Sequence, residues 1–237
     1  MNMVTTFFIV FIIVMILGKI MITIFIILSA QIKLKNENLE VVNKTKLLGA
    51  VITSDLKWHE NTKFIIKKAN KKMIMLHKFA KFTNNKSHLI HIFKSQVRGV
   101  LEYCSTVWHS SLTEAECNDI ERVQKAAVRL IMGNKYRGYK EALHYMNLES
   151  LKERRKNMAL NFAKKSLKLV KFSELFPLNS AKHLMMKRNH EKFVVKKANT
   201  ERYKKSAVPF LQRLLNEDYS KQKKVLKSLL QVNNDIS

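Results

Sequence analysis

Apolar residues recur every three to four positions in three consecutive segments of this chain, which is the spacing of one face of an α-helix. The segments lie at residues 59–82, 87–103 and 113–132. Few positions interrupt them, because the 237 residues include only 5 Gly and 2 Pro. Since 46% of the residues are hydrophobic, such helices can bury a common core. The sequence therefore predicts a mainly α protein built on a helical bundle.

The first segment separates apolar from basic positions along a single predicted helix. Its apolar stripe comprises Ile65, Ala69, Met73, Leu76 and Ala80. Lys67 and Lys71 fall on the opposite side together with other lysines, and Ile74 interrupts this basic face. We expect the apolar stripe to pack in the core and the basic stripe to meet solvent or phosphate.

The third segment has the clearest helix ends. Thr113 and Glu116 have the spacing of a capping box, in which each side chain accepts a hydrogen bond from the backbone N–H of the other residue. Gly133 is expected to end this helix. Its inward positions are Ile120, Val123, Ala127, Leu130 and Ile131. Its opposite face carries Arg122, Lys125 and Arg129. This is the cleanest amphipathic helix of the chain.

Other elements are predicted from weaker signals. Ser87 is expected to cap the second helix, and Tyr103 and Trp108 to anchor the core after it. Asn147 is expected to cap a fourth helix, and Pro209 to begin a last one. The fourth helix is predicted at residues 148–170, with Leu151, Met158, Phe162 and Leu169 inward. Residues 172–182 are expected to form a loop.

Before the first helix, short apolar runs predict a small hairpin or three-stranded element. One of them, at residues 46–53, reads KLLGAVIT and is interpreted as a short strand. Gly49 interrupts this run, and glycine at such a position commonly marks a bulge or a close approach of another backbone. Both explanations stay open from the residues alone.

The balance of charge restricts the partners of this chain. Lys and Arg outnumber Asp and Glu by 44 to 18, which gives a formal net charge of +26. Such a charge favours a polyanionic partner, either nucleic acid or anionic lipid. Solvated basic faces and the lysine-rich bias of AT-rich coding sequence are the simpler alternatives.

Residue patterns typical of catalysis are absent from the sequence. The four aspartates, Asp55, Asp119, Asp218 and Asp235, are far apart, whereas two-metal polymerase sites need clustered carboxylates. No Gly-rich phosphate loop and no hydrolase motif occur. His88 and His91 do not form a zinc pattern with the two cysteines. We therefore predict no enzyme activity, catalytic residue, metal, cofactor or small-molecule substrate.

Residues 3–30 form an almost wholly apolar run in which Lys19 is the only charge. A membrane-spanning helix needs about 20 apolar residues, so the run is long enough. Lys19 opposes insertion by about 2.5–3.5 kcal/mol near the helix centre. If the run spans a membrane, the lysines after it are expected to keep the following residues in the cytoplasm. Translated flanking or decayed DNA is the other explanation of this segment.

Four stretches of sequence, taken in order, carry a family resemblance. They are KTKLLGAVITSDLKW at residues 44–58, VLEYCSTVWHSSL at 100–112, IERVQKAAVRLI at 120–131 and TERYKKSAVPFLQRLLN at 200–216. Together they resemble the region that follows the polymerase palm in reverse transcriptases of Jockey-like non-LTR retrotransposons. The resemblance spans most of the chain after Gln31. Because no aromatic-x-Asp-Asp sequence occurs, the catalytic palm of that family is expected to be missing.

The resemblance implies different functions for successive segments of the chain. Leu47, Leu48 and Gly49 would be the primer grip, and the three following helices would be a thumb that lies against a template–primer duplex. Lys67, Lys71, Arg122, Lys125 and Arg129 are the expected phosphate contacts. Mg²⁺ is expected only for the missing palm. The predicted parts are a hydrophobic helix at 1–31, a β element at 32–58, a thumb-like bundle at 59–134 and a basic helical region at 135–237.

Three functional interpretations follow from these observations. The first is a truncated reverse transcriptase fragment that binds an RNA–DNA or DNA duplex. The second is a single-span membrane protein whose basic helical domain is drawn to anionic lipid. The third is the product of a decayed element that has no role. Localisation follows the interpretation: the membrane if residues 3–30 insert, otherwise the nucleus or the cytoplasm.

Overall fold

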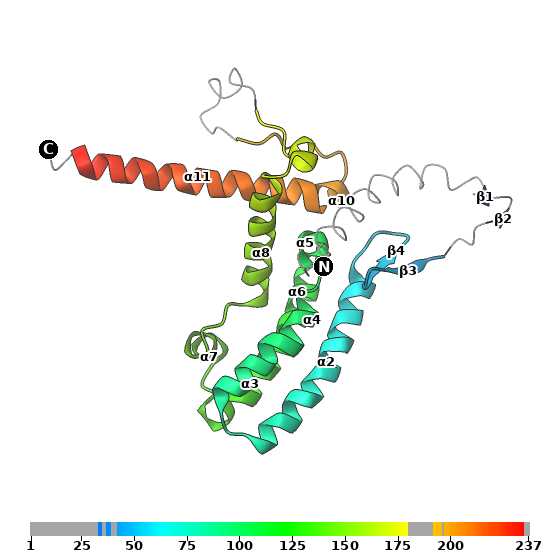
Figure 1. Ribbon diagram of the computed structural model, residues 1–237, viewed down its shortest axis with the longest axis vertical. Coiled ribbons are helices and arrows are strands. Elements are labelled where there is room, and N and C mark those ends of the chain that lie inside the picture. Colours follow the sequence, from blue (N-terminus) through cyan, green and yellow to red (C-terminus); the bar gives the residue numbers. More distant parts are fainter. Residues whose placement is uncertain (1–32, 35–36, 39–41, 180–191, 196, 235–237) are drawn as a thin grey trace.

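The computed structural model describes residues 33–34, 37–38, 42–179, 192–195 and 197–234. Most of these residues are helical, and a small antiparallel hairpin precedes the first long helix, so the predicted mainly α fold is confirmed (Figure 1). The hydrophobic helix predicted at residues 1–31 lies outside the described ranges. Within those ranges, no helix combines the length and the apolar character needed to cross a membrane.

The β structure consists of two short antiparallel pairs. They are β1 (Lys33–Leu34) with β2 (Glu37–Asn38), and β3 (Lys44–Leu47) with β4 (Ala50–Thr53). Leu47 pairs with Ala50, so the turn between β3 and β4 holds only Leu48 and Gly49. Both turn residues have positive φ, at 49° and 90°, as tight two-residue hairpins require. The single strand predicted at residues 46–53 is therefore wrong, since the run folds back on itself at Gly49.

The first predicted helix forms with the expected ends, as α2 (His59–Phe82). The second is divided into α3 (Lys86–Ile92), the π-helix η1 (Phe93–Arg98) and α4 (Gly99–Leu101). Its N-cap is Asn85 and not Ser87, because the Asn85 Oδ1 accepts hydrogen bonds from the backbone N–H groups of Ser87 and His88. An amide side chain two residues before the first free N–H groups is well placed to bind them.

The third predicted helix forms as α6 (Glu114–Met132). Two short helices precede it, α5 (Ser105–Trp108) and the 3-10 helix η2 (His109–Ser111). The capping box is confirmed, since the Thr113 hydroxyl accepts from the Glu116 N–H and the Glu116 carboxylate accepts from the Thr113 N–H. Trp108 is fully buried as expected, and its indole N–H donates to the Tyr103 carbonyl oxygen.

The C-terminal elements begin and end differently from the prediction. They are η3 (Gly133–Lys135), α7 (Tyr139–Tyr145), α8 (Leu151–Ser166), η4 (Val170–Leu175), α10 (Glu201–Lys204) and α11 (Ala207–Asn234). Asn147 has φ 50°, a left-handed conformation that ends α7 and does not start α8. Ser150 caps α8 instead, and its hydroxyl accepts from the Glu153 N–H. The loop predicted at residues 172–182 therefore begins as the short helix η4.

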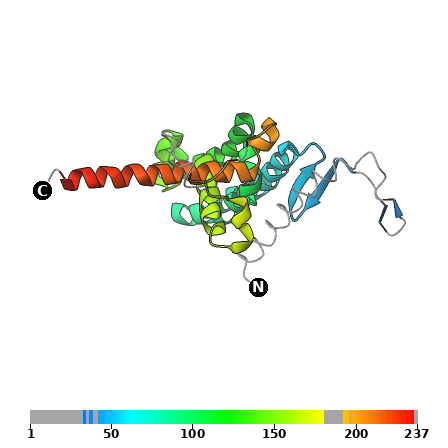
Figure 2. The ribbon, with the colours of Figure 1, turned by 90° about the horizontal axis from the view of Figure 1, so that it is seen from above.

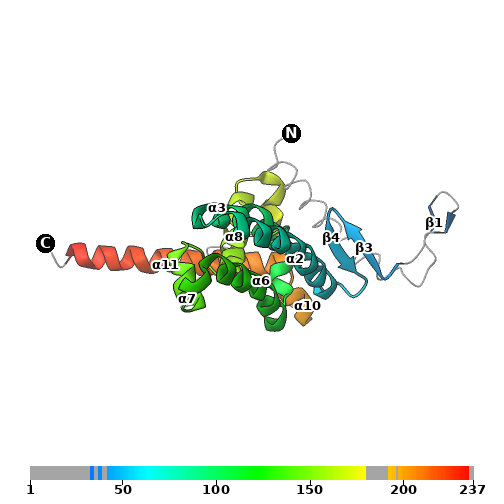
Figure 3. The ribbon, with the colours of Figure 1, turned by 90° about the horizontal axis from the view of Figure 1, so that it is seen from below.

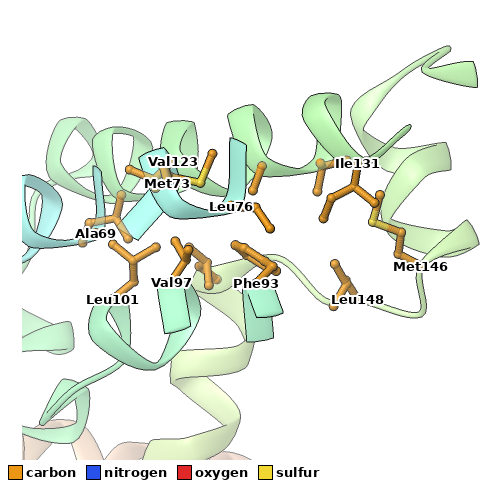
Figure 4. Packing of buried hydrophobic residues seen from close by; sticks show 14 of the residues in the cluster. Ala69, Met73, Leu76, Phe93, Val97, Leu101, Val123, Ile131, Met146 and Leu148 are labelled. Atoms are coloured by element: carbon orange, nitrogen blue, oxygen red, sulfur yellow. The ribbon is translucent and has the colours of Figure 1, made fainter. Parts of the chain in front are cut away.

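Two apolar clusters hold these elements together. The first gathers buried side chains of α2, η1, α4 and α6 and reaches Met146 and Leu148 after α7. Figure 4 shows Met73, Leu76, Phe93, Val97 and Val123 converging from separate helices in its centre. The second cluster joins α8 to α11 and to the residue after η4 through Ala159, Ala163, Phe176, Leu211 and Leu215.

Helix α11 has two different environments along its length. Its N-terminal part carries the buried Leu211, Leu214 and Leu215 and packs on α8. Beyond Tyr219 the side chains described, through Val225, are exposed. Figure 2 and Figure 3 show the C-terminal part of the helix extending away from the bundle, on the side opposite to the β3–β4 hairpin.

The inward face predicted for α8 is only partly right. Leu151 is buried, but Leu169 follows the helix and is 40% exposed. The buried positions of the helix are Leu151, Arg155, Ala159, Ala163 and Ser166, which follow one another at intervals of three or four residues. Ala159 and Ala163 each lie one residue after a predicted inward position. The sequence pattern failed here because the most polar residue of that series, Arg155, is completely buried.

Candidate nucleic-acid interface

The predicted primer-grip residues lie at the turn of the β3–β4 hairpin. Leu48 is 40% exposed, and Leu47 and Gly49 are partly buried. The Tyr103 hydroxyl donates a hydrogen bond of 2.7 Å to the Leu48 carbonyl oxygen. A Cβ atom built on Gly49 would lie 3.1 Å from Cε1 of the Tyr103 ring. Gly49 is therefore needed for the fold itself, by its positive φ and by the approach of Tyr103.

Strand β4 of the hairpin is attached to α2. The side-chain Oδ1 of Asn61, which is buried in the first turn of α2, accepts a 3.1 Å hydrogen bond from the backbone N–H of Val51. This attachment leaves an open cavity of about 460 Å³ between the hairpin and α2. Phe64 and Val51 supply apolar lining to the cavity.

Four lysines surround this cavity, which we call the hairpin groove. They are Lys44, Lys46, Lys63 and Lys67, all exposed. The Lys46 Nζ lies 4.9 Å from the centroid of the Phe64 ring, in the geometry of a cation–π contact. Glu60 also borders the groove and lies 3.3 Å from Lys63 Nζ and 3.9 Å from Lys44 Nζ. With one carboxylate against four ammonium groups, the groove has an excess of positive charge.

Two regular spacings explain why the four lysines lie together at the hairpin groove. Lys44 and Lys46 are two residues apart on β3, so they lie on the same face of the strand. Lys63 and Lys67 are four residues apart on α2, so they lie one turn apart on the same side of the helix. Of the four, the sequence predicts only Lys67 as a contact. The spacing of residues within the strand or within the helix does not reveal that the hairpin packs on α2.

Lys71 continues the exposed side of α2 one turn beyond Lys67. It lies away from Ala69, Met73 and Leu76, which face the core. The predicted assignment of Lys67 and Lys71 to the outer face thus agrees with their exposure. Lys67 borders the hairpin groove, and Lys71 does not line it.

The three predicted contacts on α6 have partners within the protein. Arg122 Nη1 lies 2.7 Å from an Asp119 carboxylate oxygen in a highly exposed ion pair. Lys125 Nζ lies 5.3 Å from the Tyr139 ring centroid, and the Arg129 guanidinium carbon lies 5.4 Å from that of Tyr136. Lys125 and Arg129 therefore border the segment around α7, whereas Lys67 borders the hairpin. The predicted contacts, all among the described residues, thus fall in two sets, one on α2 and one on α6.

Buried ionic groups occur elsewhere, where α8 meets the end of α4. Glu102 is 7% exposed and lies 2.6 Å from Arg154 Nε and 3.9 Å from Arg98 Nε. Burial raises the pKa of Glu102, and the two guanidinium groups act against that rise. Burial also lowers the pKa of Arg98, and the charge of Arg154 contributes. These groups connect residues far apart in sequence.

A second buried polar pair lies beside Trp108. The Nε–H of Arg155 donates to His109 Nδ1 over 3.4 Å, and the guanidinium lies 5.8 Å from the Trp108 ring centroid. Burial lowers the pKa of His109 to about 4, with a further contribution from the positive charge of Arg155. His109 is therefore neutral at pH 7 and able to accept this hydrogen bond.

A third polar network fixes the start of α8. The Glu121 carboxylate accepts hydrogen bonds from the Tyr139 hydroxyl and, at 3.0 Å, from the backbone N–H of Leu151. Gln124 donates to Tyr139 and to the Glu149 carbonyl oxygen, both at 2.9 Å. Burial raises the pKa of Tyr139, with a further rise from its hydrogen bond to Glu121. This network orients the Tyr139 ring, which makes the cation–π contact with Lys125.

Within the described ranges, no three His, Cys, Asp or Glu side chains are grouped closely enough to hold a metal ion. The expectation of a metal-free, catalytically inactive chain stays a prediction. The fold and these surfaces define a mainly helical, strongly basic protein with a lysine-ringed groove beside its hairpin. The chain matches no protein-family model, no curated protein and no solved structure.

Proposed function

We propose that this protein binds nucleic acid duplexes through their phosphate backbones, without sequence preference and without polymerase activity of its own. The observation that carries the proposal is the hairpin groove, where Lys44, Lys46, Lys63 and Lys67 surround an open cavity. Ammonium groups on rigid strand and helix positions can bind successive phosphates of one strand. Lys71 extends this surface along α2.

The family resemblance supports a particular nucleic acid. Residues 44–58 resemble the primer grip of non-LTR retrotransposon reverse transcriptases, and the thumb implied by the resemblance begins at residue 59. The hairpin groove lies between these two parts. The proposed ligand is therefore a template–primer duplex, RNA–DNA or DNA. The proposal assigns no catalysis to the chain, because its four aspartates are far apart in sequence and no aromatic-x-Asp-Asp sequence occurs.

The surface of α6 is a second set of proposed contacts. Arg122 is highly exposed despite its ion pair with Asp119, and exposed pairs of this kind contribute little energy. Arg122 can therefore leave Asp119 and bind a phosphate at a small cost in free energy. Lys125 and Arg129 rest on tyrosine rings, which hold their charged groups in place.

The test is the binding of the full chain to a labelled RNA–DNA primer-template over a series of salt concentrations. We expect the logarithm of the binding constant to fall linearly with the logarithm of salt concentration. Each phosphate contact contributes roughly −0.9 to that slope on a B-form duplex, so the four groove lysines alone contribute about −3 to −4 and the other proposed contacts make the slope steeper. Several unrelated sequences should bind with equal affinity.

Single-stranded DNA of equal length is the comparison that separates a duplex clamp from a general polyanion surface. A clear preference for duplex supports the template–primer assignment. Absence of binding at low salt, by protein whose circular dichroism is helical, would show that the basic surfaces are only solvated.

A further inference from the structure

The far end of α2 has an unusual surface composition. Phe82 is 88% exposed, Ile74 is 60% exposed and Phe79 is 43% exposed. Lys78 and Lys81 are exposed between them. In Figure 1 this end of α2, with the turn into α3, forms the lower end of the molecule. We call the exposed side chains of Ile74, Lys78, Phe79, Lys81 and Phe82 the α2 tip.

Four of these side chains share one stripe of the helix. Relative to Ile74, the residues Lys78, Lys81 and Phe82 stand at i+4, i+7 and i+8, which is the repeat of a single helix face. The core-facing side of the same helix is already buried through Met73 and Leu76. The tip stripe is therefore an additional face that alternates apolar and cationic groups, and not a continuation of the core.

A neighbouring segment extends this surface. The Lys86 Nζ at the start of α3 lies 5.3 Å from the centroid of the Tyr145 ring, which belongs to the last turn of α7. Tyr145 is 63% exposed. A third exposed aromatic side chain thus contacts the start of α3, just after the turn that follows α2.

The charge of the region has one sign over a long stretch of chain. Between Glu60 and Glu102 the sequence contains nine lysines and one arginine, and no Asp or Glu. No carboxylate of α2 beyond its first turn can therefore neutralise Lys78 or Lys81. The charge of this surface is complementary to that of an anionic partner.

The apolar members of the stripe decide between two polyanions. A nucleic acid would bind the lysines and could stack a base on Phe82, but it offers no apolar environment to the aliphatic Ile74. The interface of an anionic bilayer offers both, because acidic headgroups lie directly above acyl chains. Exposed apolar side chains grouped among cations are typical of such interfacial contacts.

We propose that the α2 tip is a docking surface for anionic lipid bilayers. Phe82 and Ile74 enter the boundary between headgroups and acyl chains, and Lys78 and Lys81 bind acidic headgroups. Phe82 lies 15 residues beyond Lys67, which is about 22 Å along the helix axis. The docking surface is therefore distinct from the hairpin groove and does not depend on the function proposed for it.

The test uses the full chain with Phe82→Trp and vesicles whose acyl chains are brominated, which quench indole fluorescence on contact. The protein also contains Trp108, which is buried, and Trp58, which is partly buried, so the unsubstituted chain measures their contribution. With vesicles of phosphatidylcholine and phosphatidylserine, we expect a blue shift and quenching of the added tryptophan. With phosphatidylcholine alone, we expect neither. Leu178→Trp, at a residue 64% exposed and distant in sequence, should stay unchanged.

A second variant tests the role of the lysines. Adding Lys78→Gln and Lys81→Gln to the Phe82→Trp chain should weaken vesicle affinity about fivefold per lysine, or roughly 25-fold for the pair. Vesicle binding without a shift at position 82 would place the contact in another segment and overturn the proposal. A shift caused by an oligonucleotide, but not by anionic vesicles, would overturn it in favour of nucleic acid.

Discussion

The Tyr103 hydroxyl binds the Leu48 carbonyl oxygen across 55 positions of sequence, and this 2.7 Å hydrogen bond holds the tip of the β3–β4 hairpin on the helical bundle. A two-stranded hairpin has little stability alone in water. The position of the hairpin groove therefore depends on this contact and on the bond between Asn61 and Val51.

Replacement of Tyr103 by Phe should loosen the hairpin without unfolding the bundle. The change removes one hydrogen bond at a partly exposed site, with an expected loss of about 1 kcal/mol. Amide hydrogen exchange in β3 and β4 should become about fivefold faster. Tyr145→Phe is the control, because that ring lies far from the hairpin in sequence and contacts Lys86. Equal exchange rates in both variants would contradict a tethering role.

Two glycines should respond in opposite ways to replacement by alanine. Gly49 has φ 90° and is closely approached by the Tyr103 ring, so Gly49→Ala should destabilise the hairpin by about 2 kcal/mol. Gly99 has helical φ, and nothing lies within 4 Å of an added Cβ. Gly99→Ala should therefore stabilise the protein by about 0.5–1 kcal/mol. Hairpin amide exchange and urea unfolding measure the two effects, and effects of equal sign would refute the assigned geometry.

Neutralisation of the hairpin groove should weaken nucleic-acid binding and flatten its salt dependence. Lys46→Gln with Lys67→Gln should reduce the slope by about 0.9 for each phosphate that is no longer bound. Lys223→Gln with Lys224→Gln is the matched control, because it removes the same charge from exposed positions on α11. If both pairs reduce the slope equally, binding is a property of total charge and not of the groove.

Neutralisation on α6 tests the second basic surface separately. The triple variant Arg122→Gln, Lys125→Gln and Arg129→Gln should weaken duplex binding with unchanged helix content, since all three lie outside the core. The triple change of Lys221, Lys223 and Lys224 to Gln removes equal charge from α11. A duplex affinity that falls only in the groove variant would exclude α6 from the interface.

The neutral His109 should make the stability of the protein depend on pH. Its pKa is near 6.5 in the unfolded chain and about 4 in the folded protein, so between these values only the unfolded chain takes up the proton. Neutral His109 therefore contributes about 3 kcal/mol to the free energy of unfolding above pH 6.5, and this contribution is lost as the pH falls to 4. His109→Gln keeps an acceptor for Arg155. Urea unfolding at pH 7 and pH 4 should show a smaller loss in this variant than in the parent chain.

Removal of the buried carboxylate of Glu102 should destabilise the protein. Glu102→Gln leaves the partly buried Arg98 and Arg154 without their shared negative charge, and losing a hydrogen bond to a charged group costs about 1–3 kcal/mol. Glu153→Gln, at an exposed position of α8, should change the free energy of unfolding by less than about 0.5 kcal/mol. Similar unfolding curves for the two variants would show that the cluster does not stabilise the fold.

The helices with regular apolar stripes can be predicted from the sequence. The bounds of α2 and the capping box of α6 are as expected, because local spacing and local hydrogen bonds determine them. The sequence predicts Asn147 as the cap of α8, whereas the structure has Ser150 there. Both residues are good caps, and the choice depends on the left-handed conformation that Asn147 adopts at the end of α7.

The candidate site can be predicted only in part, because it depends on contacts between distant segments. The sequence predicts Tyr103 in the core, but this residue supports the hairpin at the surface. Arg155 is fully buried beside Trp108, which the polarity of an arginine side chain does not reveal. Lys44, Lys46 and Lys63 join Lys67 only because the hairpin packs on α2. Helical periodicity carries no information on such pairings.

The long helix α11 carries a mechanical consequence. Its first turns are anchored by Leu211, Leu214 and Leu215, whereas the part from Tyr219 onward is about 24 Å of helix beyond the anchor. A free helix of that length is marginal in water, so it is maintained by propagation from the anchored turns. A change that exposes those three leucines should therefore unfold the C-terminal part of α11, on which Lys221, Lys223 and Lys224 are exposed. The length of the exposed helix thus depends on packing in the second apolar cluster.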